Sequence, residues 1–174
     1  ARFGISESQI ARGEINDAPL YIDDSPNMTL AEIRAKCRRL ATQVGLQMVV
    51  IDYLQLMSSG KKVESRQQEV SEFSRALKLL AKELGVPVIA ISQLNRNSEK
   101  SDNKRPEISQ LRESGSLEQD ADVIILLHRE AMYQKDHARA GEADIILGKQ
   151  RNGPIGDIVV NFLGQYSKFE DIKR

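Results

Sequence analysis

The stretch Met48-Val-Val-Ile-Asp52 decides the fold, because four consecutive apolar residues end directly in a carboxylate. An unbroken apolar run of this kind is typical of a strand that is buried on both faces of a sheet. Val86 to Ile91 is a second such run, ending at Ser92-Gln93, and Val123 to Leu127 is a third. The three runs predict the central strands of an α/β fold.

Helical patterns separate these strands. Thr29-Leu-Ala-Glu32 is a capping box, and apolar residues at three- and four-residue steps continue from it to about Val44. The range 65–84 has the same periodicity and predicts a long second helix. We expect a short helical piece around 109–114 and a short strand at 20–23.

The C-terminal part of the chain predicts a hairpin. Strands are expected at 143–150 and 156–163, on either side of Asn152-Gly153, which is the strongest short hairpin signal. The polar, basic range 95–106 is expected to be a mobile loop, and 130–141 a polar excursion. The whole pattern predicts a mainly parallel sheet with helices on both faces and an antiparallel C-terminal hairpin.

Composition limits the classes of function. The chain has 174 residues, enough for one domain with its own core, and its 25 Lys and Arg balance its 25 Asp and Glu. Any contact with nucleic acid must therefore come from local loops and not from a basic body. The single Cys37 excludes an internal disulfide and a cysteine-rich metal site, and its helical spacing favours a core thiol.

Neither a metal cluster nor a membrane segment is predicted. His128 and His137 have no partners at the spacing of metal ligands and are interpreted as ordinary polar residues. Apolar runs end at about five residues, far short of a membrane span, and no segment resembles a signal peptide. The chain is therefore expected to be soluble and cytoplasmic.

Asp52 and Gln93 are the first candidate site residues. Each follows a predicted parallel strand, at the sheet edge where α/β folds bind ligands. An acid at this position holds Mg²⁺ in nucleotide hydrolases, often through water, and an amide beside it could sense a γ-phosphate or orient the attacking water. The alternative for Asp52 is a carboxylate that caps a turn, and for Gln93 an amide that makes local backbone bonds.

A third candidate segment is Leu111-Arg-Glu-Ser-Gly-Ser-Leu-Glu-Gln-Asp-Ala-Asp122. Arg112, Ser114 and the backbone at Gly115 could meet the phosphates of a nucleic-acid strand, since glycine permits a close approach. The segment contains no aromatic residue, which favours contact with the backbone over base stacking. The alternative is a capped, charged surface helix.

The fourth candidate is Gly148-Lys-Gln-Arg-Asn-Gly-Pro154, which joins two cations to the predicted hairpin turn. Lys149 and Arg151 are two residues apart, so in a strand their side chains point to the same face. Such a basic fork suits a phosphate, including one that is bound by a neighbouring subunit. The alternative is a solvated strand end with ordinary surface cations.

Four segments occur in one order along the chain: Ile51-Asp-Tyr-Leu-Gln-Leu-Met57, Ser92-Gln-Leu-Asn-Arg96, Arg112-Glu-Ser-Gly-Ser-Leu-Glu-Gln-Asp-Ala-Asp122 and Gly148-Lys-Gln-Arg-Asn-Gly-Pro154. Together they closely resemble the RecA-like motor domain of the bacterial replicative DNA helicases of the DnaB type. The resemblance covers nearly the whole chain from Leu20 onward. It implies a six-membered ring that encircles single-stranded DNA and unwinds the duplex at the replication fork by hydrolysing ATP with Mg²⁺. It also implies a primase and a helicase loader as partners, and a nucleoid-associated location.

The resemblance assigns roles to residues of this sequence. Asp52 matches the Walker B acid that helps to hold Mg²⁺, and Gln93 matches the sensor that links the nucleotide to the DNA loops. Arg112, Glu113 and Gly115 fall where the family contacts DNA phosphates. Arg151 matches the arginine finger that reaches the adjacent subunit's γ-phosphate, and Lys149 is its companion. Hydrolysis would then depend on assembly, and such fingers contribute roughly 10³–10⁵ in rate.

The sequence departs from the family pattern in one respect: it contains no Gly-x-x-x-x-Gly-Lys-[Ser/Thr] phosphate loop. The resemblance places that Walker A loop upstream of residue 1, so 1–174 is expected to be a partial motor domain without ATPase activity of its own. The range 13–20 is also shorter than the family leads us to expect. Two alternatives remain: a RecA- or KaiC-like ATPase that forms filaments or rings without unwinding, and a non-enzymatic remnant that binds neighbours.

Overall fold

The computed structural model describes residues 18–26, 28–57, 65–94 and 104–172. Within them lie three α-helices and six strands: α2 (Leu30–Val44), β1 (Val49–Ile51), α3 (Arg66–Leu84), β2 (Val88–Ala90), α4 (Gly115–Asp120), β3 (Val123–His128), β4 (Glu142–Gln150), β5 (Gly156–Leu163) and β6 (Lys168–Glu170). Four short 3-10 segments join them: η1 (Leu54–Leu56), η3 (Ile108–Ser114), η4 (Glu130–Met132) and η5 (Gly164–Tyr166).

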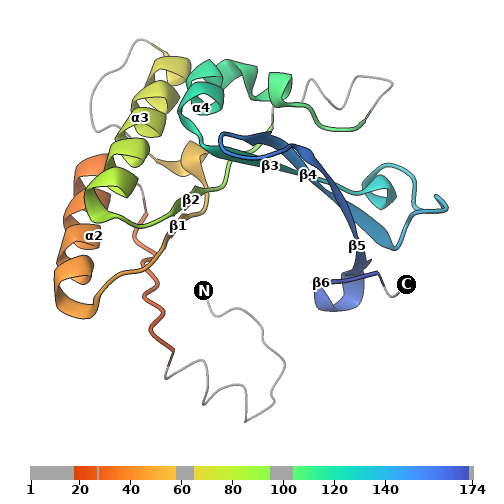
Figure 1. The fold of residues 1–174 in the computed structure, drawn as a ribbon, viewed down its shortest axis with the longest axis horizontal. Coiled ribbons are helices and arrows are strands. Elements are labelled where there is room, and N and C mark those ends of the chain that lie inside the picture. Colours follow the sequence, from red (N-terminus) through yellow and green to blue (C-terminus); the bar gives the residue numbers. More distant parts are fainter. Residues whose placement is uncertain (1–17, 27, 58–64, 95–103, 173–174) are drawn as a thin grey trace.

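The strands form two sheets. β1 and β2 pair in parallel, with Ile51 opposite Ala90, whereas the other four strands form an antiparallel sheet in the order β3-β4-β5-β6. Figure 1 shows α2 and α3 beside β1 and β2, α4 beside α3, and the antiparallel sheet extending away from them toward the C-terminus. The predicted α/β class and the C-terminal hairpin are confirmed. A mainly parallel sheet was expected, but antiparallel pairing dominates among the described strands.

The helices that were predicted from capping and periodicity are confirmed. The Thr29 side chain accepts from the Glu32 amide at 3.3 Å and the Glu32 carboxylate accepts from the Thr29 amide at 2.8 Å, which completes the capping box of α2. Gly45 ends the helix with a φ of +74°, a conformation that side chains disfavour. Ser65 caps α3 in a similar way, by accepting from the Gln68 amide.

The helices and the parallel sheet share one core. Its buried residues come from α2, α3 and the segment after β1: Ile33, Cys37, Leu54, Met57, Phe73, Leu77 and Leu80. Cys37 lies here as predicted, and burial raises the pKa of its thiol. Phe73 is fully buried, and removal of such a ring costs about 3–5 kcal/mol. On the surface Arg38 and Arg34 bind Glu83 and lower the pKa of its carboxylate, which joins α2 to α3.

The expectation that the central strands are buried on both faces is wrong for the described residues. Val49, Ile51 and Val88 pack against the helical core, but Val50 and Ile89, which are opposite each other on the second face, are 58% and 47% exposed. Along β3 buried and exposed residues alternate in the same way. The described helices therefore cover one face of these strands, and the apolar residues on the other face have no cover among the described residues.

The strand predicted at 20–23 is not formed. Leu20 and Ile22 are 64% and 75% exposed, and the segment pairs with no described strand. Asp23 holds this segment to α2, because its carboxylate binds Lys36. This hydrogen bond is the main cause that lowers the pKa of the Asp23 carboxyl to about 2. Most of the predicted loop 95–106 lies outside the described residues, as does the range 13–17.

Strand β4 contains a bulge in its pairing with β3, which the sequence did not indicate. β4 pairs with β5 only as far as Leu147 opposite Gly156, and beyond this point it pairs with β3 alone. There Ile125 is opposite Leu147 but Ile124 is opposite Lys149, so Gly148 is an extra residue. A bulge turns the following side chain to the other face. Lys149 therefore shares the face of the buried Ile124, toward the helices.

The expected tight turn at Asn152-Gly153 is wrong. A two-residue turn of that kind requires positive φ angles, and neither residue has one. The connection between the strands runs over 151–155, as the expected strands at 143–150 and 156–163 imply, so only the conformation at Asn152-Gly153 differs.

Gly148 offers a test of this geometry. A Cβ at this position would lie 3.0 Å from two side-chain carbons of Ile108, so Gly148→Val should crowd η3 against the sheet and destabilise the fold by about 1–3 kcal/mol. Urea unfolding followed by circular dichroism measures this change. Gly141→Val is the matched control, because nothing lies within 4 Å of a Cβ there and its φ is not positive. Equal losses for the two variants would contradict the described packing.

Candidate functional site

The structure places Asp52 and Gln93 at the same edge of the parallel sheet. Asp52 directly follows β1, and Gln93 is three residues beyond β2. The two chains remain hydrogen-bonded past the strands, because the Ile91 amide donates to the Ile51 carbonyl and the Leu54 amide donates to the Ile91 carbonyl, both at 2.9 Å. Both side chains are exposed and available to a ligand. The predicted adjacency of the two segments is therefore present.

Gln55 joins these two segments, a role that sequence analysis missed. Its side-chain nitrogen donates to the Ser92 hydroxyl at 3.0 Å and to the Gln93 carbonyl at 3.3 Å. Its side-chain oxygen accepts from the Gln93 amide at 3.4 Å. One amide side chain thus contacts both polar groups of the Gln93 backbone. It ties the sensor candidate to the segment that follows Asp52.

Arg66 holds the same segment from the other side. Its guanidinium donates to the carbonyls of Leu54, Gln55 and Met57 at 3.3, 2.7 and 3.1 Å. These carbonyls belong to η1 and to Met57 directly after it, and the Leu54 carbonyl also accepts from the Met57 amide at 3.1 Å. Because Arg66 is the first residue of α3, the position of η1 and hence of Gln55 depends on this helix.

The bridge at Gln55 can be tested by hydrogen exchange. Gln55→Ala removes the acceptor of the Gln93 amide, so we expect this amide to exchange faster and the free energy of unfolding to fall by about 0.5–1.5 kcal/mol. Amide exchange measured by NMR is the direct readout. Amides of α2 should change only as far as the global stability changes. An unchanged Gln93 amide would refute the bridge.

The DNA-contact candidates lie at the junction of η3 and α4. Gly115 is the first residue of α4 and is partly buried, and a Cβ there would meet nothing within 4 Å. The backbone of Arg112 and Glu113 belongs to η3, while their side chains are outside the described part. The helical piece predicted at 109–114 is thus confirmed.

Helix α4 is fastened to α3 by hydroxyl contacts. The Ser74 hydroxyl donates to the Asp120 carboxylate at 2.8 Å, and the hydroxyls of Ser116 and Ser71 are 2.9 Å apart. Both serines of α3 face α4, so the contact is polar although α3 presents apolar residues to the core. The segment that carries the candidate DNA contacts therefore rests on the same helix as η1.

Lys149 and Arg151 both contact the end of this segment. The Lys149 ammonium donates to the Glu118 carbonyl at 2.5 Å and to the Gln119 carbonyl at 3.4 Å, at the C-terminal end of α4. Arg151 contacts Asp122, with the guanidinium 3.2 Å from the carboxylate and its own amide donating to the Asp122 carbonyl at 2.9 Å. The bulge at Gly148 makes the Lys149 contact possible, because it turns this side chain toward α4.

Asp122 is the centre of a small charge cluster. One carboxylate oxygen binds Lys78 of α3 and the other faces Arg151. Lys78, with smaller contributions from Arg151 and Lys149, holds the pKa of Asp122 below its ordinary value. The side chains of Asp122 and Arg151 are each 54% exposed, so this ion pair contributes little to stability.

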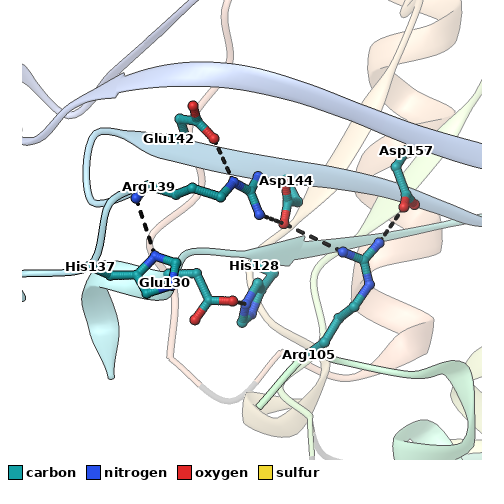
Figure 2. A network of polar contacts seen from close by, with 8 residues as sticks. All are labelled: Arg105, His128, Glu130, His137, Arg139, Glu142, Asp144 and Asp157. Atoms are coloured by element: carbon teal, nitrogen blue, oxygen red, sulfur yellow. Dashed lines mark hydrogen bonds and ion pairs between the residues drawn. The ribbon is translucent and has the colours of Figure 1, made fainter. Parts of the chain in front are cut away.

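A second polar network lies on the antiparallel sheet (Figure 2). The buried Asp144 binds the guanidinium of Arg139, and Arg105 lies 3.5 Å from the same carboxylate. Arg105 also binds Asp157, and Arg139 binds Glu142 at 2.6 Å. The contacts of Arg139 fasten the connection between β3 and β4 to the sheet, and those of Arg105 fasten the segment before η3 to it. No predicted site residue takes part, so we assign the network a structural role.

His128 and His137 behave as ordinary polar residues. His128 is buried, 3.1 Å from the Glu130 carboxylate and stacked on Tyr133, and His137 accepts from the Arg139 amide. Among the described residues no group of three or more His, Cys, Asp or Glu side chains is arranged to hold a metal ion. A cavity of about 370 Å³ beside the end of β3 is lined mainly by apolar and aromatic side chains and contains none of the predicted site residues.

The sequence indicated candidate residues for nucleotide and DNA contacts, but not the residues that hold them in place. Arg66 and Lys78 are polar residues on the predicted helix at 65–84, and Gln55 lies in the link before it; nothing in their spacing separates them from solvated residues. Asp122 stands directly before an apolar run, whereas Asp52 and Gln93 follow one. A charged residue next to the first residue of a strand was the available signal for Asp122.

Comparison with solved structures identifies the class of this fold. The chain matches a solved structure that is described as an ATPase domain, with a TM-score of 0.89 and 40% identity over 95% of this chain and 59% of that one. It matches a DnaB-like replicative helicase, described together with its interactions with primase, at the same TM-score and identity over 40% of that chain. The fold is therefore that of a RecA-like ATPase domain.

Sequence comparison gives the family. Residues 4–171 match the family described as the DnaB-like helicase C-terminal domain, and the chain belongs to it. It is 73% identical to the replicative DNA helicase DnaB of Leifsonia xyli over 92% of its own length, and 52% identical to that of Geobacillus stearothermophilus over 95%. It spans 35% and 37% of those two proteins, about a third of their length. No helix in the described part is long and apolar enough to cross a membrane.

Proposed function

We propose that the complete protein is a replicative DNA helicase, which unwinds duplex DNA by translocating along one strand at the expense of ATP hydrolysis. The observation that carries the proposal is the membership of residues 4–171 in the DnaB-like family, joined to the position of Asp52 and Gln93 at one edge of the parallel sheet. An acid and an amide at the carboxyl ends of adjacent parallel strands suit the phosphates of a nucleotide.

In this proposal Asp52 is the Walker B acid. Mg²⁺ is usually bound in nucleotide sites through one or two carboxylates, several waters and the phosphates themselves. A single exposed carboxylate at a strand end fits that arrangement, and Asp52 would hold the ion through water. The bound ion would neutralise charge that develops on the phosphates. The phosphate loop would come from another part of the complete protein.

Gln93 would act as the sensor of the γ-phosphate. Its side chain is exposed at the ligand edge, and its backbone is held by Gln55. A fixed backbone with a free side-chain amide suits a group that must detect the presence or loss of one phosphate. Any shift of Gln93 would pass through Gln55 to η1, and directly along the chain to residue 94 and beyond.

Arg151 would be the arginine finger, with Lys149 as its companion. Gln150 pairs with Val123, the first residue of β3, so Arg151 lies at the start of that strand. Asp52 and Gln93 instead lie beyond the ends of β1 and β2. The only described polar partner of Arg151 is an exposed carboxylate, which leaves the guanidinium free to be drawn away. This supports a role in a neighbour's site, which requires a head-to-tail assembly. We propose a six-membered ring.

The junction of η3 and α4 would meet single-stranded DNA. Arg112 supplies a charge for a phosphate, and Gly115 lets the backbone approach closely. Glu113 falls in the same turn. A primase and a helicase loader are proposed as partners; one of the matched structures is described with its interactions with primase.

The proposed arginine finger can be tested by substitution. Arg151→Ala in the complete protein should lower kcat for ATP hydrolysis by about 10³ or more and leave nucleotide binding largely intact, because the finger stabilises the transition state. Steady-state ATPase assays and equilibrium binding of a nucleotide analogue separate the two effects. Mixed assemblies of this variant with subunits that cannot bind nucleotide should regain part of the activity. Stable mixed assemblies with no recovery would contradict a finger in trans.

The proposed contact of Arg112 with DNA can be tested in the same way. Arg112→Ala should weaken binding of single-stranded DNA equally for all base sequences and make the dependence of log K on log salt shallower by about 0.7, the loss of one phosphate contact. Fluorescence anisotropy at several salt concentrations measures both quantities. Lys135→Ala, an exposed cation outside η3 and α4, is a control of equal charge. Weakening that is confined to particular base sequences would argue against contact with phosphates.

A further inference from the structure

Asp122 is the described partner of Arg151, and it is arranged for a temporary contact. The guanidinium and the carboxylate approach to 3.2 Å in a single contact, and both side chains are 54% exposed. An exposed pair of this kind is weak. A triphosphate carries more charge and more acceptors than one carboxylate, so it would displace Asp122 from the guanidinium.

The carboxylate itself is held in place. Lys78 of α3 binds its second oxygen, and the Lys78 side chain is only 19% exposed. The Asp122 carbonyl accepts from the Arg151 amide at 2.9 Å, which fixes the start of the 151–155 connection. The resting contact of Arg151 is therefore made on a rigid support, while the guanidinium can leave it.

We propose that Asp122 is a positioning residue that retains Arg151 until a triphosphate in the neighbouring subunit takes the guanidinium over. The proposal rests on the function proposed above for Arg151. Asp122 touches neither nucleotide nor DNA in this account; it acts only through the finger. The contact competes with the active position of Arg151 and so lowers the rate of hydrolysis.

Asp122 also places this control next to the DNA segment. It follows Asp120, the last residue of α4, by two positions, and the Ala121 amide donates to the Leu117 carbonyl of that helix. Lys149 holds the carbonyls of Glu118 and Gln119 at the same end. The contact between Asp122 and Arg151 therefore lies directly beside the C-terminal end of the segment proposed to meet DNA.

The experiment uses Asp122→Asn in the complete protein. The substitution keeps the shape and removes the charge, so kcat for ATP hydrolysis should rise about two- to fivefold with KM unchanged. This factor corresponds to about 0.4–1 kcal/mol. Asp122→Glu retains the charge and should keep kcat near that of the unmodified protein. An unchanged or lower kcat for Asp122→Asn, in a protein that assembles normally, would overturn the proposal.

Two further variants show whether the effect passes through Arg151. Asp120→Asn removes a neighbouring carboxylate that binds Ser74 and not Arg151, so it should not raise kcat. In Asp122→Asn combined with Arg151→Ala, single-turnover measurements of the residual rate should reveal no gain over Arg151→Ala alone. A gain that persists in the double variant, or appears with Asp120→Asn, would refute the proposal. Full activity of Arg151→Ala alone would instead refute the finger itself.

Discussion

Helix α3 is the constraint on which the other parts of the structure depend. Its apolar side, with the fully buried Phe73, forms the core with α2 and the parallel strands. Its first residue, Arg66, donates to three carbonyls at the end of η1. Farther along, Ser74 binds α4 and Lys78 binds Asp122. One rigid helix thus fixes the segment after Asp52, the segment after Gly115 and the resting place of Arg151.

This arrangement gives the proposed motor a physical basis for coupling. The candidate nucleotide residues and the candidate finger lie at different ends of the described strands, and polar contacts of α3 reach both regions. The polar contacts around the candidate residues are of two kinds. Those directed to the backbone, such as the Arg66 contacts, are suited to permanent support, whereas the exposed pair of Asp122 and Arg151 is weak enough to exchange. A change of state is therefore expected at the second kind.

The sequence predicted the parts of the fold that follow from local rules. The capping box at Thr29, the periodicity of 65–84 and the apolar runs gave the helices and the main strands with bounds that differ by one or two residues. The bulge at Gly148 was not predictable, because it arises from competition between β3 and β5 for the end of β4. The expected strand at 20–23 failed for the related reason that a strand needs a partner, and its apolar residues alone do not supply one.

The positions of the candidate residues relative to a sheet edge could be predicted from the sequence, but the residues that hold them in place could not. Asp52, Gln93, Lys149 and Arg151 stand at points where an apolar run ends, so their positions relative to a sheet edge could be anticipated. The residues that hold them, Gln55 and Asp122, bind across long stretches of sequence: Gln55 and Gln93 are 38 residues apart. Such long-range contacts depend on the tertiary structure and leave no local pattern.

The most direct test of the proposed role of Arg151 is a structure of the complete protein assembled with Mg²⁺ and a transition-state analogue of ATP. We predict that the Arg151 guanidinium lies within hydrogen-bonding distance of the γ-phosphate analogue bound by the adjacent subunit. At every such site the contact between Arg151 and Asp122 should be broken. A guanidinium that remains on Asp122, or points into solvent, while the neighbouring nucleotide site is fully occupied would contradict it.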